Sequence, residues 1–391
     1  MTRPSFREYA PRVPRIVWGA GCAGAIGDEM VRIGAQRALI LCSASIGSSA
    51  WLKTVRAGLG SRCAAVVAGA QAHTPIETLN ACVEAVRCSS ADCLVMVGGG
   101  SVQDTAKLTA LMLAEGEDLE RHRVRWTSDR RLEIPTLAAQ KMPLIAVPTT
   151  LAAAEVVGAA TYVSGDKRYV IVDPALLPRV VLYDPDIAVR TPVQIFLGTG
   201  INAVAHCVEA ICSIRAQPFS EALALKALSM LVESLGRCAL DPASRDAREQ
   251  AQLAAGMSGI AYATTWLGIA HSLCQALGAR LRAPQGALHA VMLPHAMRFN
   301  APATSRYENE LVAAILRGMP SLADEAAQDS ASLMGAFIAR LGLAQTLRKI
   351  DVPATSLKAI ADDAFTIWHT FFNPRKVESP RQLVEILQAA W

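Results

Sequence analysis

Two features that often reveal a protein's environment or partner are missing from this sequence. Its ten cysteines include no Cys-x-x-Cys pair, and most of them, such as Cys42, Cys82 and Cys93, lie inside apolar runs. Buried, reduced thiols in a cytosolic protein explain this usage best. There is also no run of lysine and arginine with interleaved aromatic residues, and the net charge is only +4. We therefore expect reduced thiols and no nucleic-acid partner.

Signs of export or membrane insertion are equally scarce. The first ten residues, MTRPSFREYA, lack the apolar core of a signal peptide, so we expect a cytoplasmic protein. Residues 251–279 contain no formally charged side chain and are long enough to span a bilayer. However, the segment is rich in Gly, Ser, Thr and Gln and includes His271. This composition favours a buried helix or helix pair in a helical domain, and no membrane span.

The chain of 391 residues is 52% hydrophobic and 18% charged, which is typical of a compact enzyme with two domains. In the first half, apolar strand-like runs alternate with helical patterns, of which residues 76–86 give the clearest. This alternation predicts a parallel sheet covered by helices. The second half contains long helical patterns, such as residues 221–235. We predict an α/β dinucleotide-binding domain (1–190) and an all-α catalytic domain (191–391), with strands over 38–42, 64–67, 93–97 and 143–147.

Residues 95–107, VMVGGGSVQDTAK, contain the most informative motif of the chain. An apolar strand runs into three glycines, after which Ser101 is expected to cap a helix and Asp104 to complete a capping box. Glycines let the backbone approach a phosphate closely, and the helix N-terminus attracts its charge. A tight turn without a ligand is the alternative. The spacing matches neither the Rossmann nor the P-loop pattern.

The same stretch, GGGSVQDTAK, resembles the GGGS-x-x-D-x-AK signature of the iron-containing (group III) alcohol dehydrogenase superfamily. Pro148, Thr149 and Thr150 resemble the Pro-Thr-Thr turn of that superfamily, although Ala153 and Ala154 replace its Gly-Ser or Gly-Thr pair. The resemblance implies the matching fold, a homodimer, and NAD or NADP as the cofactor. The cofactor-binding residues that it implies are Gly98, Gly99, Gly100, Ser101, Asp104, Thr149, Thr150 and Lys167.

The choice between the two cofactors stays open at the sequence level. The expected end of the second strand reads LCSAS, over residues 41–45. It contains no carboxylate that would hold a ribose 2′-hydroxyl or repel a 2′-phosphate, so NADPH is not excluded.

The resemblance also locates a site where metal-binding members of the superfamily carry one aspartate and three histidines. Here those positions are Asn202, His206, His271 and Gln285, and a further active-site histidine of the family is Gln275. Asparagine at position 202 resembles the maleylacetate reductase branch of the superfamily, and this resemblance implies reduction without a metal. Gln275 and Gln285 depart even from that branch, in which both positions are normally histidine. Two imidazoles and two weak amide oxygens make a poor ligand set for Fe²⁺ or Zn²⁺. We therefore expect no divalent metal.

Together these features predict an NAD(P)H-dependent reductase of a carbonyl or enone acid. Without a metal, a side chain must meet the charge that develops on the substrate oxygen. We expect His271 to donate the proton, although its uncharged surroundings favour the neutral imidazole. His206 and Gln285 would orient the oxygen, and Gln275 is at the position that faces the nicotinamide in relatives. Asn202 completes the set of candidate catalytic residues.

Two arginines, Arg280 and Arg282, would suit a carboxylated substrate, with solvated surface positions as the alternative. A second interpretation of the whole chain is a family member that has kept the fold and the cofactor site but has lost redox turnover. The protein would then be a binding protein, or a lyase or isomerase that uses the same cleft.

Overall fold

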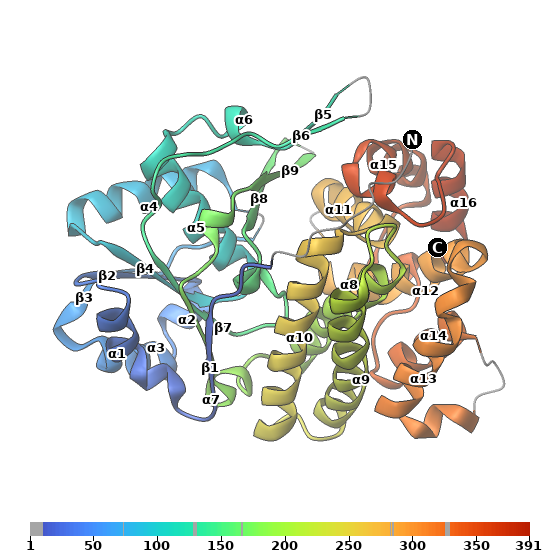
Figure 1. Cartoon of the computed structure of the whole chain (residues 1–391), viewed down its shortest axis with the longest axis horizontal. Helices are drawn as coiled ribbons and strands as arrows, with labels where there is room; N and C mark the ends of the chain where they lie inside the picture. The colour runs from blue at the N-terminus through green and yellow to red at the C-terminus, as the bar shows by residue number, and fades with distance from the viewer. Residues whose placement is uncertain are drawn as a thin grey trace.

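The computed structural model describes residues 11–72, 74–127, 131–165, 167–281, 283, 285–324 and 329–391. The chain forms an α/β half and a helical half, which lie side by side on the left and right of Figure 1. This arrangement confirms the fold class expected from the sequence.

Within the described chain, six strands form one sheet in which all neighbouring strands are parallel. Their order across the sheet is β1-β10-β7-β4-β2-β3. The four strands predicted from the sequence are confirmed to within one residue at each end. The strands of the sheet are β1 (Arg15–Trp18), β2 (Ala38–Cys42), β3 (Cys63–Val67), β4 (Cys93–Gly98), β7 (Leu144–Pro148) and β10 (Val180–Tyr183).

The central strands are apolar on both faces because helices cover both faces of the sheet. β2 and β4 are buried along their whole length. Alternate residues of β4 join different clusters: Val95 packs in the cluster that contains α1 and α3, and Met96 in the cluster that contains α4 and α5. The helices of this half are α1 (Ile26–Arg32), α2 (Ala44–Gly47), α3 (Ala50–Leu59), α4 (Ile76–Ser89), α5 (Gly100–Glu115), α6 (Leu119–His122) and α7 (Pro185–Ala188).

Two antiparallel ribbons extend from the α/β half. They are β5 (Arg125–Trp126) with β6 (Leu132–Glu133), and β8 (Ala159–Ser164) with β9 (Lys167–Val172). The second ribbon follows the loop after β7 and, through β9, contacts α11 of the helical half.

The helical half is built around α8, which is long and apolar enough to cross a membrane by length and composition, yet 89% of its most apolar window is buried inside the protein. The uncharged segment 251–279 falls on α10 and α11, which meet at an angle of 103°, so the predicted helix pair is confirmed. The helices are α8 (Val193–Cys212), α9 (Pro218–Leu240), α10 (Arg245–Thr265), α11 (Ile269–Leu281), α12 (Gln285–Thr304), α13 (Glu308–Gly318), α14 (Ser330–Arg340), α15 (Leu357–Thr366) and α16 (Pro380–Ala390).

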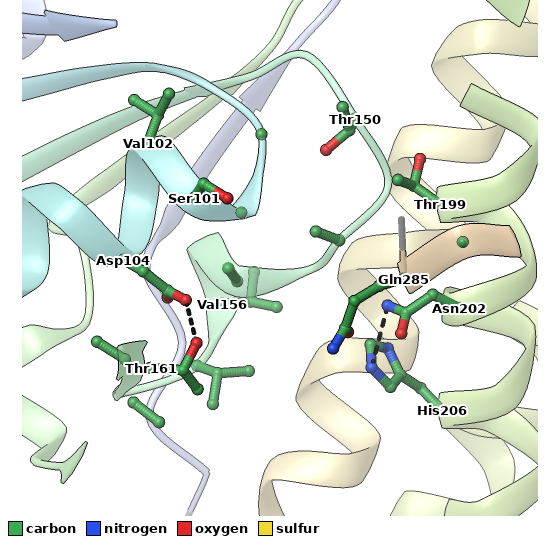
Figure 2. A pocket seen from close by; sticks show the side chains of 18 of the residues that line it. Ser101, Val102, Asp104, Thr150, Val156, Thr161, Thr199, Asn202, His206 and Gln285 are labelled. Atoms are coloured by element: carbon green, nitrogen blue, oxygen red, sulfur yellow. Dashed lines mark hydrogen bonds between the residues drawn. The ribbon is translucent and has the colours of Figure 1, made fainter. Parts of the chain in front are cut away.

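The helices α8 and α12 cross at two glycines. A Cβ atom at Gly286 would lie 2.4 Å from the carbonyl carbon of Gly198, so no larger residue fits there. This backbone contact brings Gln285, the first residue of α12, close to the turn of α8 that carries Asn202 (Figure 2).

One buried lysine on α5 joins this helix to the loop after β7. The Nζ atom of Lys107 donates hydrogen bonds to the carbonyl oxygens of Ala154, Val157 and Ala159, at 2.6, 2.6 and 2.9 Å. Burial lowers the pKa of Lys107 to about 8, while the three acceptors match the three hydrogens of an ammonium group. The side chain therefore fixes the loop that leads into β8.

We expect Lys107→Met to lower the free energy of unfolding by at least about 3 kcal/mol, since three buried carbonyls would lose their donor. Denaturant unfolding measures this loss. The matched control is Lys53→Met, because Lys53 is exposed. Equal stability of the two variants would contradict the structural role of Lys107.

Candidate active site

A cleft of about 1140 Å³ lies between the two halves of the molecule. Residues that line it come from the β4–α5 turn, the loop after β7, the β8–β9 ribbon and the helices α8 and α11. Figure 2 shows Ser101 and Thr150 on the α/β side and Asn202, His206 and Gln285 across from them on the helical side. The cleft therefore joins the two groups of residues that the sequence singled out.

The glycine turn forms the wall of the cleft on the α/β side. Gly99, Gly100 and Ser101 line the cleft, and no side chain of the described residues caps the N-terminus of α5. The first amide groups of this helix therefore offer a site for an anion. Gly98 and Gly99 are also required by packing, because Cβ atoms there would lie 2.5 Å from Val102 and 2.7 Å from Thr150.

The predicted capping box is wrong. Ser101 lies inside α5, which begins at Gly100 with Gly99 as its N-cap. Asp104 faces β8 instead, where its carboxylate accepts a hydrogen bond of 2.6 Å from the Thr161 hydroxyl (Figure 2). Burial raises the pKa of Asp104. The helix starts two residues earlier than expected, with Gly99 in place of Ser101 as its N-cap, because the glycine turn needs no side-chain cap.

The Pro-Thr-Thr turn is held by two donors that lie further along the chain, Thr191 just before α8 and Gln252 on α10. The carbonyl oxygen of Thr149 accepts a hydrogen bond of 2.7 Å from Thr191, and that of Pro148 accepts one of 3.1 Å from Gln252. Thr149 and Thr150 line the cleft, as the sequence predicts. Further along, Ala153 adopts a left-handed conformation with φ +57°, which is costly for a residue with a Cβ atom.

Lys167 does not reach the cleft. It lies exposed at the first position of β9, and Arg168 lines the cleft in its place. The Arg168 guanidinium donates a hydrogen bond of 2.8 Å to Thr161 and lies 4.0 Å from Asp104. Successive residues of a strand point to opposite faces, so an assignment that is wrong by one residue selects the wrong side chain.

On the helical side, Asn202 and His206 lie one turn apart on α8. The Asn202 amide nitrogen is 3.4 Å from His206 Nε2, and the Ser258 hydroxyl is 3.5 Å from His206 Nδ1. Burial and neighbouring histidines lower the pKa of His206 well below its usual value. His206 is therefore a neutral hydrogen-bonding group at neutral pH.

His271 has a partner that the sequence reasoning missed. Its Nδ1 atom lies 2.5 Å from Oε2 of Glu209, and Oε1 of the same carboxylate accepts a hydrogen bond of 2.9 Å from the amide of Ala270. The expectation of surroundings without a counter-charge is therefore wrong. The i+3 spacing of Glu209 from His206 on one helix was the available signal.

The other ring nitrogen of His271 is buried and has no hydrogen-bond partner among the residues that the structure describes. The same holds for the amide nitrogen of Gln285. Gln275, Gln285 and His271 all line the cleft, so the structure brings the predicted catalytic residues together.

The donor set does not fit a resident iron or zinc ion. Across the described ranges, no group of three or more His, Cys, Asp or Glu side chains is arranged to hold a metal. Asn202 and Gln285 offer only neutral amides, and the Glu209 carboxylate is bound to the Nδ1 atom of His271.

Arg280 is not available to a substrate carboxylate. Its guanidinium forms an ion pair with Asp363, to which it donates hydrogen bonds of 2.6 and 3.1 Å. Neither residue lines the cleft. The expected role of Arg280 is therefore wrong, and Arg282 lies outside the described residues.

Comparison with known proteins agrees with this geometry. The sequence profile described as "Iron-containing alcohol dehydrogenase" matches residues 13–185, and "Fe-containing alcohol dehydrogenase family, C-terminal" matches residues 196–391. Maleylacetate reductase of Rhizobium sp. is 30% identical over 95% of this chain and 93% of its own. Maleylacetate reductase 1 of Cupriavidus pinatubonensis is 29% identical over 94% and 92%. The crystal structure of maleylacetate reductase from Agrobacterium tumefaciens superposes with a TM-score of 0.81 at 27% identity, covering 99% of each chain.

The fold and the cleft define an NAD(P)-dependent oxidoreductase. The chain belongs to the iron-containing alcohol dehydrogenase family, and within it to the maleylacetate reductase branch.

Proposed function

We propose that the protein reduces a carbonyl or enone acid with NADH or NADPH, without a metal, and that His271 donates the proton. The observation that carries this proposal is the pairing of His271 with Glu209, which leaves an unpartnered imidazole nitrogen in a residue that lines the cleft. The glycine turn lies in the same cleft, so that a cofactor and a substrate can meet there.

In this proposal the amide groups at the N-terminus of α5 would hold the pyrophosphate of the cofactor. Arg168 takes the cationic position that the sequence assigned to Lys167, because Arg168 is the residue that lines the cleft. Ser43 and Ser45, just after the end of β2, line the cleft, and the residue between them is not acidic. Either NADH or NADPH is therefore compatible with this end of the cleft. The full set of proposed contacts is Gly98, Gly99, Gly100, Ser101, Asp104, Thr149, Thr150 and Arg168.

The chemistry follows from where charge appears. A bound reduced nicotinamide would supply a hydride, either to the carbonyl carbon or to the conjugated carbon of an enone. In both cases negative charge develops on the carbonyl oxygen, and His271 transfers its Nε2 proton to that oxygen. Glu209 fixes the orientation of the ring and stabilises the imidazolium before transfer. Asn202, His206 and Gln285 orient the oxygen, and Gln275 lies toward the nicotinamide.

We also propose a division into a cofactor domain (1–190) and a catalytic domain (191–391), since α8 begins just after the last strand of the sheet. A homodimer is supported by β1, an edge strand whose Trp18 is 57% exposed. A cytoplasmic location agrees with ten free cysteines.

Replacing Gly100 by Asp tests the cofactor site. A Cβ atom there meets only Ala152, at 3.3 Å, while the new carboxylate repels a phosphate at the helix N-terminus. We expect the affinity for NADH and NADPH to fall at least about 10-fold in calorimetric titrations. Gly335→Asp is the matched control, because no atom lies within 4 Å of a Cβ there. Unchanged cofactor affinity in Gly100→Asp would overturn the placement.

The weak donor set predicts a metal-free enzyme. We expect elemental analysis of the purified protein to find no stoichiometric iron or zinc, and turnover to persist in EDTA. Near-stoichiometric metal together with activity that is lost in chelator and restored by Fe²⁺ or Zn²⁺ would contradict this prediction.

The proton-donor assignment predicts that His271→Ala lowers kcat by about 10²- to 10⁴-fold with little change in cofactor affinity. His295→Ala, on α12 outside the cleft, is the control. Glu209→Gln should also lower kcat with little change in cofactor affinity, since the ring of His271 loses the carboxylate that orients it.

If Glu209→Gln keeps the kcat of the wild type, the orienting role of Glu209 is wrong. If His271→Ala keeps full turnover while His206→Ala loses it, the roles of the two histidines are reversed and the assignment is wrong.

A further inference from the structure

The short helix η9 (Trp368–Phe372) forms one wall of the cleft, although it lies far from α8 and α11 in the sequence. It packs against α11, the helix that carries His271, and it places Trp368 and His369 among the lining residues. No motif in the sequence points to these two side chains.

Both side chains carry a buried polar atom that lacks a partner. Trp368 Nε1 and His369 Nδ1 have no hydrogen-bond partner within the part of the chain that the structure describes. The His369 side chain is 5% exposed, and the two rings lie with centroids 3.9 Å apart. Buried polar atoms without partners are uncommon in folded proteins, and two of them in adjacent cleft residues indicate a ligand group.

Aromatic rings surround these atoms. Trp266 lies edge-on to Trp368, with ring centroids 5.0 Å apart, and edge-on to Phe372 at 4.4 Å. Trp266 also has φ +65°, a conformation that bulky residues rarely adopt and that persists only where the surrounding structure enforces it. Trp266 and Trp368 both line the cleft beside the two polar atoms, and the guanidinium of Arg215 lies over the ring of Trp266, 4.4 Å from its centroid.

The electrostatics of this wall suit an acceptor group. Burial and the nearby His271 lower the pKa of His369 well below its usual value, so its ring is neutral at neutral pH. The indole N–H of Trp368 only donates, and a neutral imidazole nitrogen can donate when its tautomer allows. An anionic oxygen binds such donors more tightly than a neutral oxygen does.

We propose that Trp368 and His369 bind the carboxylate of a planar, conjugated oxo acid whose unsaturated chain lies against Trp266 and Trp368. This inference rests on the proposed function, for which it names the residues that select the substrate. It also replaces Arg280, which is bound to Asp363, as the expected site of carboxylate recognition.

Calorimetric titration of the protein, saturated with NAD⁺ or NADP⁺, with acetylacrylate tests the proposal without requiring turnover. Trp368→Phe keeps an aromatic face and removes the N–H, so we expect it to weaken binding about 10-fold or more. Trp391→Phe is the matched control, because the Trp391 indole N–H donates to the carbonyl oxygen of Val352 outside the cleft. Levulinate, which lacks the conjugated double bond, should bind the wild type more weakly than acetylacrylate does.

Equal affinity of wild type and Trp368→Phe for acetylacrylate, or no binding to the wild type, would overturn the inference. A steady-state assay of NADH and NADPH oxidation with the same acids decides the proposed function separately. If acetylacrylate binds tightly, in a way that depends on Trp368, but is not reduced, the result would support the carboxylate site and contradict the proposed reductase activity.

Discussion

The carboxylate of Glu209 connects the main parts of the catalytic half. It extends from α8, accepts hydrogen bonds from the first amides of α11, and holds the ring of His271. A negative charge at the N-terminus of a helix is favourable, so the same group positions α11 and the histidine that it carries. The chain bends by 103° between α10 and α11. The contact with Glu209 therefore also fixes where α11, which lines the cleft with His271 and Gln275, begins.

The negative charge of this site lies behind the imidazole that borders the cleft. Asn202 and Gln285 face the cleft as neutral amides, while the carboxylate is buried on the Nδ1 side of His271. The carboxylate therefore holds the ring of His271 in one orientation through Nδ1 and leaves Nε2 without a partner among the described residues.

Local patterns in the sequence were sufficient for the fold and for part of the site. Apolar runs of five residues predicted β2 and β4, and three consecutive glycines located the turn before α5. Trp368 could not be found in this way, because the other residues that line the cleft lie far away along the chain, and the only local signal for Glu209 was its i+3 spacing from His206. The assignment of Lys167 in place of Arg168 shows a different limit, since only the strand geometry reveals which of two adjacent cations enters the cleft.

The glycine contact between α8 and α12 has a consequence for how such a site can evolve. Gly198 and Gly286 keep the two helices at a fixed distance through their backbones, so the spacing between Asn202 and Gln285 requires no ion. Side chains at these positions can be exchanged while the helices stay in place. Chemistry and architecture are therefore separable in this half of the molecule, because the groups that the two helices display can change without a change in the spacing between the helices.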